Sequence, residues 1–275
     1  MLSYQHGYHA GNFADVIKHL TLTRVLNYLT LKEKPLFYLE THAGRGLYDL
    51  EDRQALKTQE ATQGIFRLWE EKHQLPHVFS PYLELISTFN QKDKLRYYPG
   101  SPAFAIHMLR EYDRLFLCEL HPEEFKYLKT MKHHNMRVHY SHSDGLKELK
   151  ALLPPTERRG LIFIDPSYEI KTDYRQIPQL LKTVYRRFST GVYCIWYPLV
   201  DRKFNEQLQR GFNNIGTTHH LRVEFYLHRP SEAGMTGCGL LIINPPYVLL
   251  EELKLALEVL CRLFNPGLSS YLLEN

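Results

Sequence analysis

Short apolar runs alternate with amphipathic stretches along most of this chain, and this alternation restricts the fold more than any other feature. Seven runs are rich in β-branched and aromatic residues and end at turn or cap residues: 36–41, 114–120, 137–141, 161–165, 192–197, 222–227 and 239–244. Several are apolar at every position, which is typical of strands covered on both faces. Strand–helix alternation then predicts an α/β fold with a doubly wound, mostly parallel sheet.

Two connections depart from this alternation. About sixty residues, 50–110, separate the first two predicted strands, although a single crossover connection needs only ~12–30. Helical patterns at 65–72 and 82–89 indicate that this segment is an inserted helical subdomain. Only about ten residues, 228–237, separate the last two strands, which is too short for a crossover helix and predicts an antiparallel pair.

The N-terminal thirty residues form a separate motif and helix. Asn12 can cap this helix, and the apolar residues that follow recur at helical spacing: Phe13, Val16, Ile17, Leu20, Val25, Leu26 and Leu29. We therefore expect one domain over residues 1–275, with residues 1–30 as its N-terminal motif and helix and residues 50–110 as its helical insertion.

Composition excludes several classes of protein. No run approaches the ~18 apolar residues that cross a bilayer, and the polar N-terminus does not look like a signal peptide. Four scattered cysteines indicate reduced thiols, so we expect a cytoplasmic protein without membrane contact. The fifteen histidines form no set of four ligands with recognised spacing, and we expect no metal. Phosphate-loop and Gly-x-Ser-x-Gly motifs are absent from the sequence.

Acidic residues or glycines follow three successive predicted strands. The turn after the first strand contains His42, Gly44 and Gly46, and glycines there let the backbone approach a nucleotide. Glu119 ends the second strand, where a carboxylate can accept hydrogen bonds from ribose hydroxyls. Asp144-Gly145 follows the third, where a carboxylate can accept from an adenine amine. A tight turn and two helix caps are the alternatives, but three such turns together favour a nucleotide-like ligand.

The sharpest chemical signal is Asp165-Pro166-Ser167-Tyr168 at the end of the fourth strand. An exocyclic amine is a poor nucleophile because its lone pair is delocalised into the ring. The Asp165 carboxylate and the Pro166 carbonyl can orient its two hydrogens, and Tyr168 can stack on the base. The alternative is a simple turn with a packed tyrosine. Asn244-Pro245-Pro246-Tyr247 has similar letters, but we interpret it as a structural turn because the last strand lies far from the switch point.

Taken together, these motifs resemble the RlmJ family of bacterial 23S rRNA (adenine-N6)-methyltransferases. The resemblance covers nearly the whole chain and includes Leu2-Ser3-Tyr4, His9-Ala10-Gly11-Asn12, Ala14-Asp15-Val16-Ile17-Lys18-His19, Thr41-His42-Ala43-Gly44, Pro99-Gly100-Ser101-Pro102, Glu119-Leu120-His121-Pro122, Asp144-Gly145, Asp165-Pro166, Trp196-Tyr197-Pro198 and Asn244-Pro245-Pro246. One position departs from the family pattern, because Ser167 stands where the family has a second proline. We expect this substitution to loosen the loop without removing either acceptor.

The resemblance implies a class I, Rossmann-like methyltransferase with a seven-stranded sheet and an antiparallel last strand. It implies methyl transfer from S-adenosyl-L-methionine to the N6 amine of an adenine in 23S rRNA that is protein-free or in early assembly. A monomer is expected. By matched position, Asp165 is catalytic with Pro166 and Tyr168, Tyr4 approaches the target base, and the cofactor residues are Lys18, His19, His42, Ser101, Glu119, Asp144 and Gly145.

Three other functions remain open from the residues. The first is a DNA adenine-N6 methyltransferase, or a protein for the use of external DNA, which is an older label of some relatives. The second is a protein-glutamine methyltransferase with Asn244 at its reaction centre. The third is a non-catalytic nucleic-acid-binding protein, which would bind RNA with a steep salt dependence but would not bind S-adenosylmethionine. If the chain acts on RNA, the insertion at 50–110 is the segment that we expect to hold it.

Overall fold

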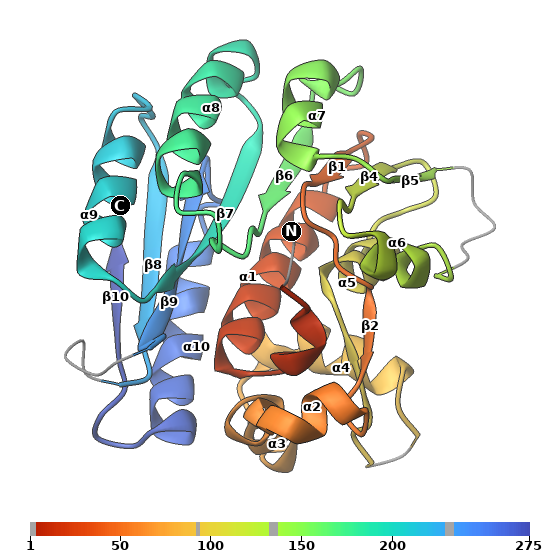
Figure 1. The fold of residues 1–275 in the computed structure, drawn as a ribbon, viewed down its shortest axis with the longest axis vertical. Helices are drawn as coiled ribbons and strands as arrows, with labels where there is room; N and C mark the ends of the chain where they lie inside the picture. The colour runs from red at the N-terminus through yellow and green to blue at the C-terminus, as the bar shows by residue number, and fades with distance from the viewer. Residues whose placement is uncertain (1–3, 92–93, 132–136, 229–233) are drawn as a thin grey trace.

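An eight-stranded sheet forms the centre of the computed structural model, which describes residues 4–91, 94–131, 137–228 and 234–275. Its strands run in the order β10-β8-β9-β7-β6-β1-β4-β5 (Figure 1). Their bounds are β1 (Phe37–Glu40), β4 (Arg114–Cys118), β5 (Val138–Ser141), β6 (Gly160–Ile164), β7 (Val192–Leu199), β8 (His220–Tyr226), β9 (Gly237–Ile243) and β10 (Ser270–Glu274). Leu2, Ser3 and residues 229–233 of the β8–β9 connection lie outside the described residues.

The pairing of the strands confirms the predicted fold class. Strands β1, β4, β5, β6 and β7 are parallel, whereas β9 lies antiparallel between β7 and β8. A last core strand inserted in this antiparallel way is typical of class I S-adenosylmethionine-dependent methyltransferases. All seven predicted strands are present, but the expected count of seven was too low, because β10 adds an eighth strand antiparallel to β8.

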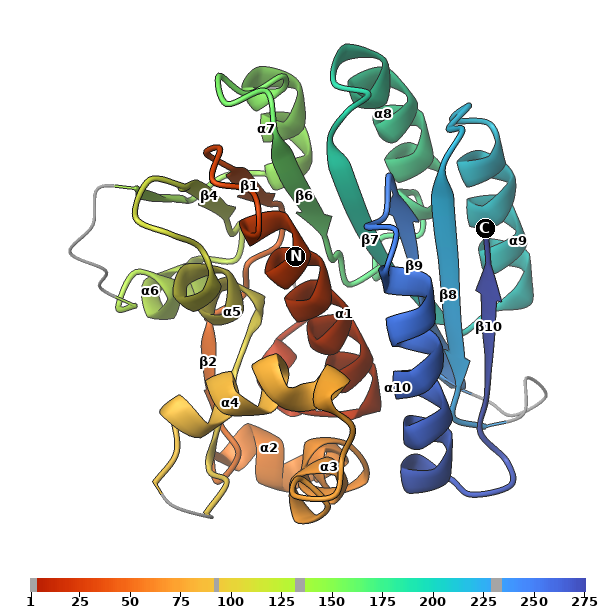
Figure 2. The same cartoon turned by 180° about the vertical axis from the view of Figure 1, so that it is seen from behind.

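Helices cover both faces of the sheet. On one face lie α1 (Phe13–Thr30), α5 (Ser101–Met108) and α10 (Leu249–Phe264), which are seen in Figure 2. On the other face lie α7 (Gly145–Leu152), α8 (Asp173–Arg187) and α9 (Arg202–Asn213). The short α6 (Pro122–Leu128) follows β4. Each face of the sheet therefore has its own apolar core, which explains why the predicted strands are apolar on both sides.

Helix α1 brings polar side chains into the interior of the protein. Asn12 caps it as predicted, since its side chain accepts a hydrogen bond from the Asp15 amide at 2.9 Å. The helix packs against α4, α5 and α10 and is buried along most of its length, including Asp15, Lys18 and His19. Neither α1 nor any other helix in the described ranges is long and apolar enough to cross a membrane.

The segment between the first two core strands is mainly helical. It contains a two-stranded ribbon that the sequence did not predict, formed by β2 (Leu47–Asp49) and β3 (Tyr97–Pro99), and α5 leads from this ribbon to β4. Between these strands lie α2 (Arg53–Thr58), η2 (Glu60–Gln63), α3 (Ile65–Glu70), η3 (His77–Phe79) and α4 (Ser80–Thr88). Helix α2 contacts the N-terminal turn η1 (His6–Tyr8), so the insertion and the N-terminus lie side by side.

Candidate active site

A cleft of about 590 Å³ opens at the carboxyl ends of β1, β4, β5 and β6. This volume lies within the range of small-molecule sites, and the edge where parallel strands end is where α/β sheets bind ligands. The lining includes every residue that the sequence predicted for the site: Tyr4, Lys18, His19, His42, Ser101, Glu119, Asp144, Gly145, Asp165, Pro166 and Tyr168. Tyr4 and Tyr168, 164 positions apart in sequence, therefore meet in one cleft.

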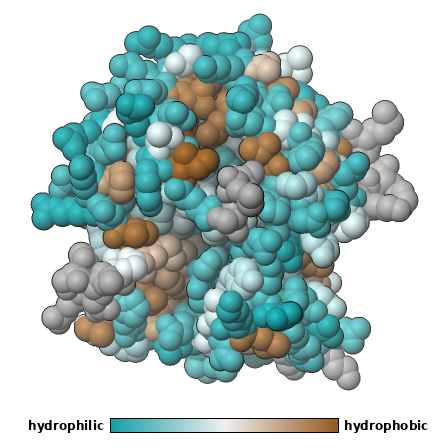
Figure 3. Space-filling model, viewed as in Figure 1, coloured by the Kyte–Doolittle hydropathy of each residue, from teal (hydrophilic) through white to brown (hydrophobic). Residues whose placement is uncertain are grey.

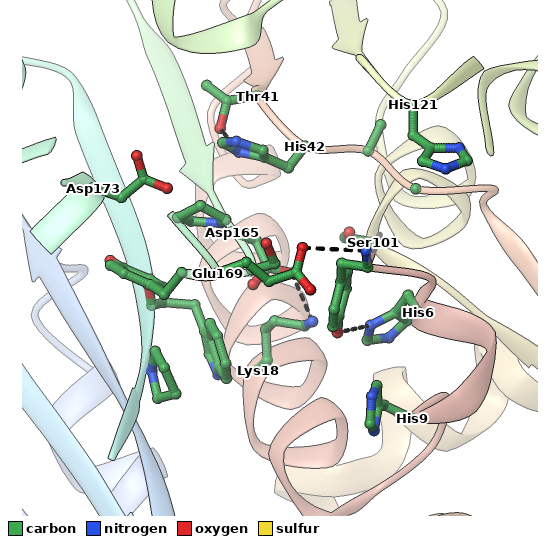
Figure 4. Close-up of a pocket in the computed structure, with 18 of the residues that line it drawn as sticks. His6, His9, Lys18, Thr41, His42, Ser101, His121, Asp165, Glu169 and Asp173 are labelled. Atoms are coloured by element: carbon green, nitrogen blue, oxygen red, sulfur yellow. Dashed lines mark hydrogen bonds and ion pairs between the residues drawn. The ribbon is translucent and has the colours of Figure 1, made fainter. Parts of the chain in front are cut away.

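Lys18 connects two carboxylates at the bottom of the cleft. Its Nζ lies 2.8 Å from Asp15 Oδ1 on the same helix and 2.6 Å from Asp165 Oδ2 in the loop after β6 (Figure 4). The Lys18 side chain is 5% exposed, so water screens neither ion pair well. Although burial alone would lower it, the two carboxylates raise the pKa of Lys18. The ammonium group is therefore held as a cation beside Asp165.

The N-terminal segment closes one side of this cluster. The Tyr4 hydroxyl lies 2.8 Å from His6 Nδ1, and His6 Nε2 lies 2.8 Å from Asp15 Oδ2. Burial alone would raise the pKa of Asp15, but His6 and Lys18 hold it well below its usual range. A hydrogen-bonded chain thus runs from Tyr4 through His6, Asp15 and Lys18 to Asp165.

A buried carboxyl group lies at the end of β1. Glu40 Oε2 accepts a hydrogen bond from the Tyr38 hydroxyl at 3.0 Å, and Oε1 accepts one from the Ser101 hydroxyl. Burial raises the pKa of Glu40 to about 8, although both hydrogen bonds act to lower it. Glu40 is therefore mainly protonated at neutral pH and adds little negative charge to the cleft.

Glu119 joins the loops that follow β1 and β4. Its two carboxylate oxygens accept hydrogen bonds from the backbone N–H groups of Gly44, at 2.7 Å, and His121, at 2.6 Å. Gly44 has a φ of +62°, a conformation that favours glycine. Burial raises the pKa of Glu119, and the two N–H groups oppose this shift. The Glu119 carboxylate thus holds the two loops together and also lines the cleft.

Asp144 caps a helix, and Gly145 allows the backbone to pack closely. Asp144 accepts a hydrogen bond from the Leu146 amide at 3.1 Å, so the capping alternative is correct, but its side chain also lines the cleft. A Cβ atom on Gly145 would lie 2.2 Å from the carbonyl oxygen of Thr41, so no larger residue fits there. Beside it, burial lowers the pKa of His42 to about 4, which keeps that imidazole neutral.

His19 carries a buried polar atom without a protein partner. Its Nδ1 lies 2.8 Å from the Tyr98 hydroxyl, whereas Nε2 has no hydrogen-bond partner among the described residues. Burial holds the pKa of His19 well below its usual range, so the ring is neutral. Such an atom in the lining of a cleft favours a polar ligand there. The described residues contain no cluster of three or more His, Cys, Asp or Glu side chains that could hold a metal ion.

The loop after β6 leaves two acceptors open. In the described part of the chain, no donor is bonded to Asp165 Oδ1 or to the Pro166 carbonyl. Tyr168 adopts a φ of +54° and turns inward, where its ring lies 4.6 Å from the ring of Tyr174. Its hydroxyl donates to the Trp196 carbonyl at 3.1 Å, and only 2% of the residue is exposed. In this structure Tyr168 offers little free ring surface, so its stacking role stays a prediction.

Comparison with known proteins agrees with this geometry. Residues 33–272 match the family model of ribosomal RNA large subunit methyltransferase D, RlmJ. The chain belongs to the RlmJ family. Two relatives named ribosomal RNA large subunit methyltransferase J are each 42% identical to it: one from Haemophilus influenzae, aligned over 100% of this chain and 98% of the relative, and one from Escherichia coli K12, over 92% and 91%.

A solved structure of high similarity comes from Legionella pneumophila. That protein is 54% identical to this chain, with a TM-score of 0.93, and the match covers 97% of this chain and 98% of that one. The architecture described above is therefore shared at nearly full length with an experimental structure.

Three residues of this RlmJ-family cleft have no role in the sequence prediction. Asp15 and His6 belong to the chain of contacts around Lys18, and Trp196 lines the cleft from β7 with Lys18 Nζ 5.6 Å from its ring centroid. Asp15 had a detectable signal, because it is an acid between apolar neighbours, three residues before Lys18 on the same helix. Trp196 belongs to the Trp196-Tyr197-Pro198 motif of the resemblance, but only the tertiary fold brings it and His6 to Lys18.

The second Asx-Pro-Pro-Tyr-like motif lies at the other edge of the sheet. Because β9 is antiparallel, Asn244 follows the end of β9 that pairs with the start of β7, opposite to the cleft. Its Nδ2 donates to the carbonyls of Ser189 and Gly191, both at 2.7 Å. The interpretation of this motif as a structural turn is confirmed, and the geometry gives no support to a reaction centre at Asn244.

Proposed function

We propose that this chain transfers a methyl group from S-adenosylmethionine to the N6 amine of an adenine in 23S ribosomal RNA. Membership of the RlmJ family supports the reaction class, and both curated relatives are named as methyltransferases of large-subunit rRNA. The observation that carries the proposal is the pair of open acceptors, Asp165 Oδ1 and the Pro166 carbonyl, at the end of β6. Two acceptors match the two hydrogens of an exocyclic amine.

The cleft fits the cofactor on several independent observations. Its lining has an unpartnered buried nitrogen on His19, an acid on Glu119 at the end of β4, and a backbone approach at Gly145 that excludes any Cβ atom. Glu119 suits ribose hydroxyls, and Asp144 suits the amine of an adenine. We assign cofactor binding to the residues predicted from the sequence, namely Lys18, His19, His42, Ser101, Glu119, Asp144 and Gly145. Bound S-adenosylmethionine would supply an electrophilic methyl group on a sulfonium, whose S–CH3 bond breaks on transfer to leave a neutral thioether.

Asp165 and Pro166 make the target amine a better nucleophile by orienting it. When Asp165 Oδ1 and the Pro166 carbonyl each accept one amine hydrogen, the nitrogen lone pair is directed out of the base plane. Lys18 holds the other carboxylate oxygen of Asp165 at 2.6 Å and so fixes its orientation. As the new N–C bond forms, Asp165 Oδ1 is placed to receive the proton that the amine releases. Most of the rate enhancement comes from this positioning and from fixed charges.

The target adenine has to leave any base stack to reach this loop. Tyr4 lies on the N-terminal side of the cleft and Trp196 on the β7 side, with Lys18 between them. We assign Tyr4 to the approach of the base, and the partly exposed ring of Trp196 is better placed for stacking than that of Tyr168, which packs inward. A base that flips freely favours 23S rRNA that is protein-free or early in assembly. The enzyme then acts as a monomer in the cytoplasm, where ribosomes are assembled.

Methyl transfer to protein-free 23S rRNA tests the proposal directly. The assay follows labelled methyl groups from S-adenosylmethionine and compares the unaltered protein with Asp165→Asn. We expect transfer to adenine N6 and at least a ~100-fold lower rate in the variant, because an amide cannot receive the proton. Asn244→Ala is the control and should keep full activity. Methylation of DNA in preference to rRNA, or loss of activity in Asn244→Ala with Asp165→Asn active, would contradict the proposal.

A further inference from the structure

The net positive charge of this chain is concentrated on two neighbouring helices. Together, α8 and α9 contain seven Lys and Arg residues against two Asp and Glu residues, a net charge of +5, whereas the whole chain carries +4. The two helices pack side by side on one face of the sheet (Figure 1), with the rings of Tyr174 and Phe204 stacked at 5.0 Å. The remainder of the protein is therefore close to neutral.

The cations on these helices form rows that are exposed except at the half-buried Lys182. Arg175, Lys182 and Arg186 are seven and four residues apart on α8, and at 100° per residue they fall within about 20° of one line. They point away from the buried side of the helix, and the row is about 16 Å long at 1.5 Å per residue. Lys203 and Arg210, also seven residues apart, share one face of α9. We call these five residues the basic face; the surface over α8 and α9 is hydrophilic in Figure 3.

These charges lack acidic partners. In the part of the chain that the structure describes, none of the five side chains of the basic face forms an ion pair within 4.0 Å. The pair between Arg202 and Glu206 on α9 lies next to them but involves neither row. These cations are available to phosphate groups without first breaking an ion pair, although Arg210 also donates to the Glu206 carbonyl at 3.2 Å.

The insertion at 50–110, which the sequence led us to expect as the RNA-holding segment, shows the opposite pattern. It contains eight Lys and Arg residues against seven Asp and Glu residues. Several of its cations already have partners: Lys94 lies 2.8 Å from Glu51, Arg96 lies 2.7 Å from Asp49, and Arg67 donates to the Leu263 carbonyl at the end of α10. Charge complementarity to RNA is therefore weak on the insertion and strong on the basic face.

The basic face also begins next to the cleft, because Tyr174 and Gln176, the neighbours of Arg175 on α8, line it. Lys171, just before α8, lines the cleft as well, and its Nζ lies 5.3 Å from the Phe204 ring of α9. We propose that the basic face is the docking surface for the phosphate backbone of the RNA and leads it into the cleft. This inference rests on the proposed function for the identity of the RNA. It assigns the electrostatic part of binding to α8 and α9 instead of the insertion.

Two matched variants test the assignment. The first, Arg175→Gln/Lys182→Gln/Arg186→Gln, removes three charges from the basic face. The second, Arg53→Gln/Lys72→Gln/Lys94→Gln, removes three charges from the insertion and leaves the same net charge. Equilibrium binding of a 23S rRNA fragment is measured for both and for the unaltered protein between 50 and 300 mM salt. Circular dichroism and S-adenosylmethionine binding show whether each variant is folded and keeps its cleft.

The expected effect is large and specific to one variant. The slope of log K against log salt concentration is negative, and each lost phosphate contact reduces its magnitude by ~0.7–0.9. Three lost contacts therefore reduce this magnitude by about 2–3 and weaken binding roughly 10- to 100-fold. We expect this loss in the α8 variant, with a raised KM for RNA and a kcat within about twofold. An equal or greater loss in the insertion variant, or unchanged affinity and slope in the α8 variant, would overturn the inference.

The same experiment separates this inference from the proposed function. If the unaltered protein binds RNA through the basic face but transfers no methyl group, the proposed function fails and the docking surface stands. If methyl transfer to adenine occurs in both variants with unchanged KM, the proposed function stands and the docking surface is wrong.

Discussion

Lys18 is the residue whose removal tests the electrostatic design of the cleft most directly. Lys18→Met keeps the length and apolar stem of the side chain but removes the ammonium between Asp15 and Asp165. Those two carboxylates then face each other in a cleft where their side chains are 2% and 14% exposed. His6 and the Gly11 amide still contact Asp15, but no cation remains beside Asp165 within the described residues.

The expected cost follows from burial and geometry. Removing one partner of a buried, hydrogen-bonded ion pair costs about 3–5 kcal/mol, because the remaining charge loses its compensation. At roughly 2 °C per kcal/mol for a chain of this size, Tm should fall by about 6–10 °C. Lys126→Met is a matched control, because Lys126 lies 2.6 Å from Glu123, as close as Lys18 lies to Asp165, but is 70% exposed. Its Tm should be unchanged, since water screens exposed pairs.

The pH dependence of the effect identifies its cause. In the intact protein the pKa of Asp15 is held well below its usual value of 3.8, so the stability it contributes is present above that pH and is lost only as the pH falls through the lowered pKa. Without Lys18, only His6 and His19 oppose the effect of burial, so we expect the pKa of Asp15 to rise. The variant is then most destabilised at high pH, and the difference shrinks as the carboxyl group takes up a proton.

Thermal unfolding by circular dichroism at pH 5 and pH 8 measures this difference. We expect the Tm of Lys18→Met to lie further below that of the unaltered protein at pH 8 than at pH 5. Asp15→Asn in the Lys18→Met background should recover part of the lost stability, since it removes one of the two uncompensated charges. An equal loss at both pH values, or a loss no larger than in Lys126→Met, would refute the electrostatic explanation.

Two further predictions concern Trp196 and Glu40. The chain has two tryptophans, so in the Trp69→Phe variant the fluorescence of tryptophan comes from Trp196 alone. This fluorescence should be quenched when RNA containing the target adenine binds in the cleft. Unquenched fluorescence with RNA bound would exclude stacking on the Trp196 ring. Because burial raises the pKa of Glu40 from 4.5 to about 8, the unfolded chain loses this proton first, and stability should fall as the pH rises between these values. The free energy of unfolding, measured with urea at pH 5, 6.5 and 8, should depend less on pH in Glu40→Gln than in the unaltered protein. The same pH dependence in both proteins would contradict a raised pKa of Glu40.

The core strands were predictable because their burial leaves a local signature. A strand covered on both faces is apolar at every position, and each such run in this sequence is a core strand of the sheet. Strand β10 escaped prediction since it lies at the edge of the sheet and is only partly buried, so its residues show no continuous apolar run. The β2–β3 ribbon escaped it because each strand has three residues, which is too short for a periodic pattern.

The location of the site was predictable for a topological reason. Parallel strands end at one edge of a sheet, so residues that directly follow several strands must meet there, as Glu119, Asp144 and Asp165 do. The orientation of a side chain within the site depends on tertiary packing and was not predictable in this way. Tyr168 is in the expected loop, but its positive φ and its contact with Tyr174 turn the ring inward.

The contacts of Asp165 are the part of the site that no local sequence pattern could predict. Lys18 reaches Asp165 from α1, 147 positions earlier in the chain, only because α1 is buried beside the ends of β1 and β6. This contact changes the chemistry expected of the loop. With Oδ2 bound to Lys18, a single carboxylate oxygen remains for the target amine, and the second acceptor has to be the Pro166 carbonyl. Asp165→Asn removes the carboxylate that accepts the proton. The Pro166 carbonyl is part of the backbone, so its contact with the target amine persists in this variant. Loss of rate with RNA affinity largely retained is therefore the result that this geometry requires.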